Sequence, residues 1–128
     1  MALLLAVLDR YTDVDLLSRD VYVNVAGGLR ILEPAADLAL ALTLASSRLD
    51  LPLPRDVVAC GEIGLGGEVR RVGRIDARLR EAERLGFRRV LLPRGVDTSA
   101  ASSGLEIVPV EGIADAVEFL RTSVHART

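Results

Sequence analysis

Glycine residues punctuate residues 61–76 and limit how this stretch can fold. The stretch reads GEIGLGGEVRRVGRID, with glycine at positions 61, 64, 66, 67 and 73. Glycine adopts backbone conformations that other residues avoid, so this spacing favours short extended segments joined by tight turns. A buried-looking strand pattern precedes the stretch at residues 57–60, and a helical pattern starts at about residue 74. We therefore expect a strand, a turn between extended segments, and then a helix.

The rest of the chain alternates between strand and helix patterns. Alternating β-branched runs predict strands, and apolar residues at helical spacing predict helices. Pro34 suits the first turn of a central helix that is apolar around most of its surface. In chain order we expect a helix at 2–11, strands at 21–25 and 29–32, a helix at 34–48, strands at 57–60 and 68–72, a helix at 74–85, strands at 88–93 and 105–110, and a helix at 113–124. This pattern predicts one α/β domain over residues 1–128.

Composition excludes several classes of protein. Half of the 128 residues are hydrophobic but only 3% are aromatic, so the core must be aliphatic. A single cysteine, Cys60, permits no internal disulfide, and no Cys/His cluster is present for a metal. The apolar run at residues 3–8 is too short to span a bilayer, and no basic residue precedes it as in a signal peptide. We expect a cytoplasmic domain with no membrane partner and no metal.

The basic residues are all arginine and are unevenly distributed. Residues 70–94 hold nine arginines against Asp76, Glu81 and Glu83, a balance of +6, although the whole chain carries −2. Guanidinium groups bind phosphate bidentately, so these residues are candidates for DNA contact. The candidates are Arg70, Arg71, Arg74, Arg78, Arg88, Arg89 and Arg94, with the first four as the expected contiguous group. The alternative is an ordinary solvated surface, with pairs such as Arg78 to Glu81, or a composition bias of the genome.

Two weaker patterns have simpler interpretations than catalysis or phosphate binding. The glycines at 64, 66 and 67 lack a following Gly-Lys-Ser/Thr motif, so a tight turn is favoured over a phosphate cradle. The only histidine, His125, lies near the C-terminus, and Cys60 is expected to be a small buried apolar residue. A Cys60–His125 pair would require the terminus to fold back onto a strand end.

Three segments of the chain resemble the proteolytic domain of Lon. They are residues 21–28, the Glu-Pro-Ala-Ala-Asp segment at 33–37, and residues 61–92 with the Gly-Glu-Ile and Val-Gly-Arg-Ile steps. The Gly-Glu-Val-Arg-Arg-Val run at 67–72 is more similar still to the Lon-like domain of the RadA (Sms) family of bacterial recombination proteins. This resemblance implies an α+β fold of the ribosomal protein S5 domain 2 type, with twisted strands and packed helices.

The resemblance also implies that the peptidase site is degenerate. Lon cuts peptides with a serine and a lysine, and here Ala35 and Asp76 stand at the matching positions. Such a dyad needs a hydroxyl nucleophile and a neutral amine base, and arginine is too basic to replace lysine. The chain contains no lysine at all, so an active peptidase is only a remote alternative.

RadA-type proteins combine a zinc motif, a RecA-like ATPase and a Lon-like domain in hexameric rings that act on branched DNA. The resemblance thus implies a non-proteolytic module that binds DNA, single- or double-stranded, and helps to form the ring. The helix at 2–11 would connect it to the ATPase module of the same protein, and ATP and zinc would belong to those other parts. A purely structural ring-forming scaffold is the alternative.

Overall fold

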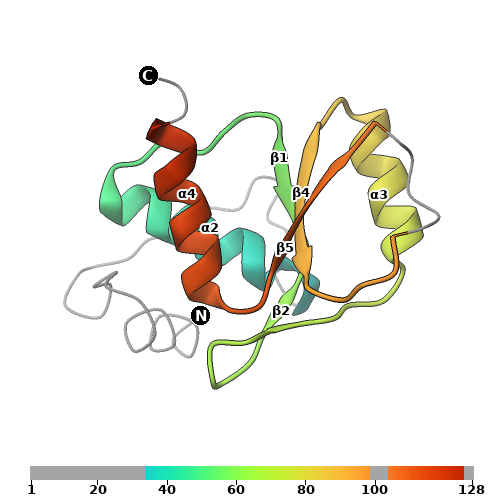
Figure 1. Ribbon diagram of the computed structural model, residues 1–128, viewed down its shortest axis with the longest axis horizontal. Helices are drawn as coiled ribbons and strands as arrows, with labels where there is room; N and C mark the ends of the chain where they lie inside the picture. The colour runs from blue at the N-terminus through green and yellow to red at the C-terminus, as the bar shows by residue number, and fades with distance from the viewer. Residues whose placement is uncertain (1–33, 99–103, 126–128) are drawn as a thin grey trace, which may run out of the picture.

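The computed structural model describes residues 34–98 and 104–125 of the chain. The elements are, in order, the 3-10 turn η2 (Pro34–Ala36), α2 (Asp37–Leu49), β1 (Val57–Ala59), β2 (Glu62–Ile63), β3 (Val69–Arg70), α3 (Ile75–Arg84), β4 (Arg89–Pro93), β5 (Glu106–Val110) and α4 (Ile113–His125) (Figure 1). Every helix and strand that the sequence predicts within these ranges is present, which confirms the mixed α/β fold. The predicted helix at 2–11 and strands at 21–25 and 29–32 lie outside the described residues.

The main sheet is parallel and has helices on both faces. Its strand order is β1-β4-β5, and Arg89 at the start of β4 is in register with Val57 and Glu106. Successive side chains of a strand point to opposite faces. Val90 and Leu92 accordingly pack with α3, whereas Leu91 packs with α2 and α4. The described part is therefore a three-layer arrangement, with α3 on one side and α2 and α4 on the other (Figure 1).

The largest fully buried side chains are all aliphatic, as the low aromatic content predicts. Leu38, Leu91 and Leu120 are fully shielded from solvent in the cluster between the sheet and the α2/α4 layer. Leu79 and Leu92 are equally shielded in the cluster beneath α3. Burying one such side chain is worth about 1.5–3 kcal/mol, so the two clusters supply most of the driving force for folding.

The glycine-rich stretch forms the antiparallel β2–β3 hairpin. The Gly67 N–H donates to the Gly64 carbonyl at 3.0 Å, and Gly67 has a φ of 81°, which confirms the tight turn. The hairpin is tied to the start of α4, since the Ile113 N–H donates to the Gly67 carbonyl at 2.8 Å. It is also tied to α2, because the Ile63 N–H donates to Asp37 Oδ2 at 3.1 Å. The hairpin thus fixes both helices at the carboxyl end of the sheet.

Two helix starts differ from the sequence prediction. The expected helix at 34–48 opens with a 3-10 turn, and α2 itself begins at Asp37. Gly61 makes two backbone hydrogen bonds to this helix start. The Gly61 N–H donates to the Ala35 carbonyl, and the Leu38 N–H donates to the Gly61 carbonyl. At α3 the residue before the helix is Arg74, which has a left-handed φ of 61°, a conformation disfavoured for any residue with a side chain.

Candidate nucleic-acid interface

The two positions that the resemblance aligns with the Lon dyad have different environments. Ala35 is 5% exposed and lies in the η2 turn that is hydrogen-bonded to Gly61. Asp76 is exposed in the first turn of α3. A serine at 35 would thus be shielded from solvent, whereas a base at 76 would be exposed to it. Since the sequence contains no lysine, neither position has the amine that the dyad requires.

Cys60 and His125 belong to opposite ends of the described structure. Cys60 directly follows β1 at the carboxyl end of the sheet, where its N–H donates to the Leu91 carbonyl at 3.0 Å. α4 begins beside the hairpin at this same end and runs away from it, so His125 closes the helix at the far end (Figure 1). Thirteen helical residues extend about 20 Å, which separates the two backbones too far for a catalytic pair.

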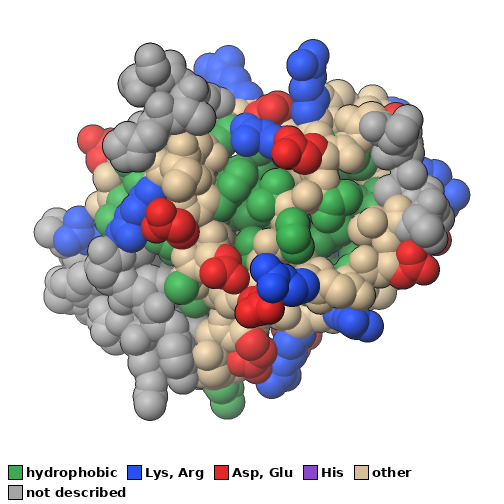
Figure 2. Space-filling view, in the orientation of Figure 1, with side chains coloured by type: hydrophobic (Ala, Val, Ile, Leu, Met, Phe, Trp, Pro, Cys, Tyr) green, Lys and Arg blue, Asp and Glu red, His purple; other side chains and the backbone are tan. Residues whose placement is uncertain are grey.

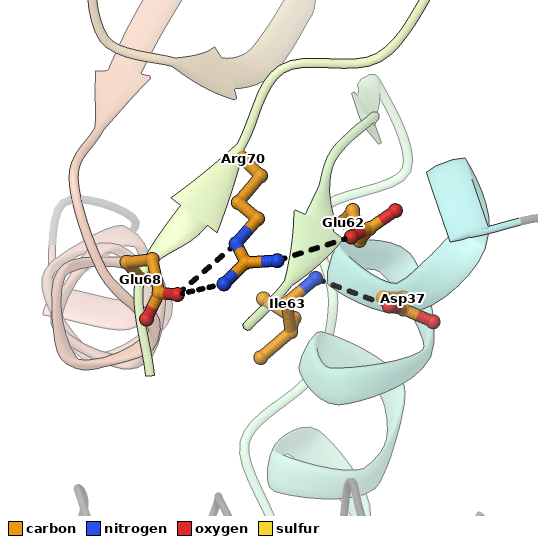
Figure 3. Close-up of polar contacts among 5 residues, drawn as sticks. All are labelled: Asp37, Glu62, Ile63, Glu68 and Arg70. Atoms are coloured by element: carbon orange, nitrogen blue, oxygen red, sulfur yellow. Dashed lines mark hydrogen bonds and ion pairs between the residues drawn. The ribbon is translucent and has the colours of Figure 1, made fainter. Parts of the chain in front are cut away.

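Arg70, one of the candidates for DNA contact, is held by two carboxylates of its own hairpin (Figure 3). Its guanidinium lies 2.8 Å from Glu68 and 3.7 Å from Glu62. The pKa of Glu68 is lowered, first by a hydrogen bond from its own backbone and then by the one from Arg70. The charge of Arg70 is therefore compensated within the hairpin.

Arg89 and Arg94 also form ion pairs, at opposite ends of β4. Arg94 Nη1 lies 2.9 Å from the Glu111 carboxylate, just beyond the carboxyl ends of β4 and β5. Arg89 Nη2 lies 3.1 Å from Asp56, and the Arg89 guanidinium is 5.5 Å from the centre of the Phe119 ring. The Arg89 side chain is 26% exposed, so these contacts bury it in part and compensate its charge.

Three other candidates lie together around the start of α3. Arg71 is exposed and donates to the Gly95 carbonyl at 3.0 Å, an uncharged acceptor that leaves its charge uncompensated. Arg78 donates from Nε to the Gly73 carbonyl at 2.9 Å. The Arg74 side chain is exposed and makes no hydrogen bond or ion pair with the described residues. Arg71, Arg74 and Arg78 are hereafter called the α3-start arginines.

Arg88 and Arg89 do not join this group, contrary to one option that the sequence left open. Both backbone N–H groups donate to the Asp56 carbonyl, which places them where β1 and β4 begin. Arg71, by contrast, contacts Gly95 beyond the carboxyl end of β4. The length of the sheet therefore separates Arg88 and Arg89 from the α3-start arginines.

The charge count along residues 70–94 overstates the basic surface. The acids that neutralise Arg70, Arg89 and Arg94 lie outside that window. Glu62, Asp56 and Glu111 reach them through strand pairing, and Glu68 lies two residues before Arg70. Glu81, a suggested partner of Arg78, binds Arg84 in an i,i+3 pair. On the face shown in Figure 2, acidic and basic side chains lie side by side around a hydrophobic area.

Sequence reasoning missed a cavity of about 530 Å³ between β1 and α3. Apolar side chains form most of its wall, including Val58 from β1, Ala77 from α3, and Leu85 and Phe87 just after α3. Cys60 also lines it, and Arg74 and Arg78 lie at its border. The sequence signal for it was the spacing of Arg74 and Arg78, which are one helical turn apart. The cavity places two guanidinium groups beside an apolar surface.

A comparison with protein families decides the relationship. Residues 10–121 match the family described as the Lon protease (S16) C-terminal proteolytic domain. The chain belongs to this family. The match covers residues 35 and 76, the glycine-rich hairpin and the arginine region, and it confirms the resemblance deduced from residues 21–28, 33–37 and 61–92.

Relatives of this Lon-family domain are named DNA repair protein RadA. The protein of that name from Aquifex aeolicus is 45% identical over 120 residues, covering 94% of this chain and 27% of the relative. The Escherichia coli protein is 44% identical over 117 residues, covering 91% and 25% respectively. The Bacillus subtilis protein is 42% identical over 125 residues, covering 97% and 27%. The chain spans about a quarter of the length of these relatives.

Neither a membrane span nor a metal cluster is found in the part of the chain that the structure describes. Within residues 34–98 and 104–125, no helix is long and apolar enough to cross a bilayer. The same residues contain no group of three or more His, Cys, Asp or Glu side chains arranged to hold a metal ion.

Proposed function

We propose that this chain is a non-proteolytic Lon-like domain of a RadA-type DNA repair protein, and that it contributes DNA contacts and ring assembly. The observation that carries this proposal is the similarity, over more than nine-tenths of the chain, to proteins named DNA repair protein RadA. The parent protein would be a cytoplasmic DNA-dependent ATPase acting in branch migration. Its ATP and zinc sites would lie in a RecA-like ATPase and a zinc module outside this domain.

Loss of peptidase chemistry follows from the residues at the dyad positions. Ala35 offers no hydroxyl, and a chain without lysine offers no amine whose pKa burial could lower. Asp76 is exposed and carries a carboxylate, not an amine. The domain therefore uses the Lon fold as a scaffold.

DNA contact is assigned to the α3-start arginines. Arg71 and Arg74 are exposed, and neither is held by a carboxylate of the described residues in the way that Glu68 holds Arg70, while Arg78 lies one helical turn beyond Arg74. Each phosphate that such a group neutralises releases counterions, which makes the binding salt-dependent. Three arginines at one end of α3 form a small patch, so we expect modest affinity for the isolated domain and cooperation among copies in a ring.

The test is fluorescence anisotropy of labelled single- and double-stranded DNA, titrated with this chain at several salt concentrations. Each arginine that meets a phosphate should reduce the slope of log K against log salt by about 0.7–0.9 when it is replaced by glutamine. Arg74→Gln is the informative variant. Arg80→Gln is the matched control, since Arg80 is exposed on the same helix but does not line the cavity beside Arg74.

A purely structural scaffold is a second candidate, favoured by one observation. Arg70, Arg89 and Arg94 all form ion pairs within the domain, as expected for residues that stabilise a fold. This function predicts assembly measured by light scattering with no DNA affinity at the same protein concentration. Equal effects of Arg74→Gln and Arg80→Gln on the salt slope would also favour it over specific DNA contact.

A further inference from the structure

We propose that the cavity between β1 and α3 binds one unstacked base of single-stranded DNA, with the neighbouring phosphate on Arg74 and Arg78. This inference rests on the proposed DNA-binding function and names the form of DNA that the site takes. The cavity volume of about 530 Å³ lies within the range of about 300–1,000 Å³ that is usual for small-molecule sites. It is large enough for a nucleobase and its sugar.

The wall of the cavity suits the flat, weakly polar face of a base. Phe87 supplies an aromatic ring, and Ala77 of α3 and Leu85 directly after α3 supply aliphatic surface. Leu85 is 58% exposed, a large apolar side chain left open to water at this border. Base–aromatic stacking is favourable for every base, because each base has a π face, so such a wall binds without sequence preference.

The border of the cavity suits a phosphate. Arg74 and Arg78 are one helical turn apart, and both line the cavity. The third charged residue there, Glu81, is bound to Arg84, so its carboxylate is compensated. The cationic side of the cavity is therefore Arg74 and Arg78, next to the apolar wall.

The backbone at Arg74 adds an independent observation. Arg74 holds a left-handed φ of 61° directly after Gly73, a position where an added Cβ would meet nothing within 4 Å. Left-handed backbone at a residue other than glycine is unfavourable and concentrates at functional sites. Here it fixes the backbone from which the Arg74 side chain extends to the cavity border, where it has no partner among residues 34–98 and 104–125.

A duplex does not offer what this cavity accepts. Bases in double-stranded DNA are stacked and paired, so only phosphates, sugars and groove edges are accessible. Single strands present unstacked bases beside their phosphates, and proteins bind them by combining aromatic surfaces with a basic groove. The structure therefore assigns a preference for single-stranded DNA to this site, whereas Arg71 outside the cavity serves either form.

The single cysteine permits a direct test in the unaltered chain. Cys60 lines the cavity, so the rate at which iodoacetamide alkylates it reports whether the cavity is occupied. We expect a saturating thymidine oligomer to slow alkylation at least about five-fold, as a bound base would shield the thiol. An oligomer of the same length with abasic sugars keeps the phosphates, lacks the bases, and should leave the rate within about two-fold of that of the free protein.

A second test fills the cavity without removing a charge. Ala77→Leu adds bulk to the wall on a helix that tolerates leucine, and Ala114→Leu places the same change on an exposed position of α4. Ala77→Leu should weaken binding of the thymidine oligomer at least about five-fold and leave duplex binding unchanged, whereas Ala114→Leu should alter neither. Circular dichroism of each variant reports whether it has folded.

The outcomes separate this inference from the proposed function. If thymidine and abasic oligomers bind equally, depend equally on Arg74 and leave Cys60 equally reactive, DNA binding stands and the base site is wrong. If no DNA binds at all, both are overturned. If the thymidine oligomer alone protects Cys60 and Ala77→Leu abolishes its advantage over abasic DNA, the base site is established.

Discussion

Glu62 and Arg70 lie opposite each other in the β2–β3 hairpin, and the Arg70 guanidinium is 3.7 Å from the Glu62 carboxylate. Glu68 holds the same guanidinium from the other side at 2.8 Å (Figure 3). Two acids thus surround one of the arginines that the sequence suggested for DNA contact. Two carboxylates against one guanidinium leave the hairpin with a net negative charge. The Arg70 charge is therefore not available to a DNA phosphate.

The first prediction is that Glu68→Gln strengthens DNA binding. The substitution keeps the shape of the side chain and removes a charge that neutralises Arg70, so the basic patch at the start of α3 would extend to the hairpin. We expect affinity to rise about two-fold or more at low salt and the gain to shrink as salt is raised, because the effect is electrostatic. Anisotropy titrations at several salt concentrations measure both.

Glu106→Gln is the control for this prediction. Glu106 is exposed and begins β5, at the opposite end of the sheet from the hairpin, and its replacement changes the net charge by the same amount. A gain of equal size in Glu106→Gln would show that net charge alone, and not release of Arg70, strengthens binding.

A second prediction concerns stability in acid. Glu68 and Glu81 both have pKa values lowered from about 4.5, Glu68 first by its own backbone amide and then by Arg70, and Glu81 by Arg84. A carboxyl group whose pKa is lower in the folded state than in the unfolded state stabilises the fold at pH values above its unfolded-state pKa. This stabilisation is lost as the pH falls through the folded-state pKa. Between about pH 5 and pH 3, the wild-type chain should therefore lose more stability than Glu68→Gln/Glu81→Gln.

Urea unfolding at each pH measures this difference. Both carboxyl groups are solvent-exposed, so the two proteins should differ by a small shift in the urea midpoint. Parallel loss of stability in the two proteins across the whole range would mean that other acids dominate the acid response.

Local patterns predicted the elements of this fold well, because each element carries its own periodicity. The strand pattern at 88–93 became β4 (Arg89–Pro93), and the helix pattern at 113–124 became α4 (Ile113–His125). Burial follows from the same alternation, since Leu91 faces one helical layer while its neighbours Val90 and Leu92 face the other. These features depend on residues close together in the chain.

The candidate site was less predictable, because it depends on residues far apart in the chain. Arg94 meets Glu111 only since β4 and β5 are parallel neighbours that end together. Arg70 meets Glu62 because the hairpin register places the two residues opposite each other. The glycines predict a turn but do not determine its length, so the sequence does not give this register. Arg74 has a left-handed backbone, whereas the sequence would favour that conformation at the preceding glycine, Gly73.

A third prediction contrasts two glycines of the same stretch. A Cβ added at Gly61 would lie 2.6 Å from Val69 Cγ1, where the hairpin meets the η2 turn, whereas one added at Gly73 meets nothing within 4 Å. Gly61→Ala should destabilise the fold by about 1–3 kcal/mol through overpacking. Gly73→Ala should be neutral or stabilise by up to about 1 kcal/mol by restricting the unfolded chain. Urea unfolding of both variants measures the contrast, and equal stabilities would contradict the packing at Gly61.

The last prediction is that restoring the dyad residues does not restore a peptidase. In Ala35→Ser the new hydroxyl would lie at a position that is 5% exposed, and the variant would still lack a lysine to act as the base. In Ala35→Ser/Asp76→Lys the lysine would be hydrated, because position 76 is exposed, and would keep a pKa near its ordinary value of about 10.4. A charged amine cannot accept the proton of serine, so neither variant should cleave a fluorogenic peptide above the wild-type background. Turnover by the double variant that disappears when position 35 is returned to alanine would show that the fold still aligns the two residues and buries the lysine.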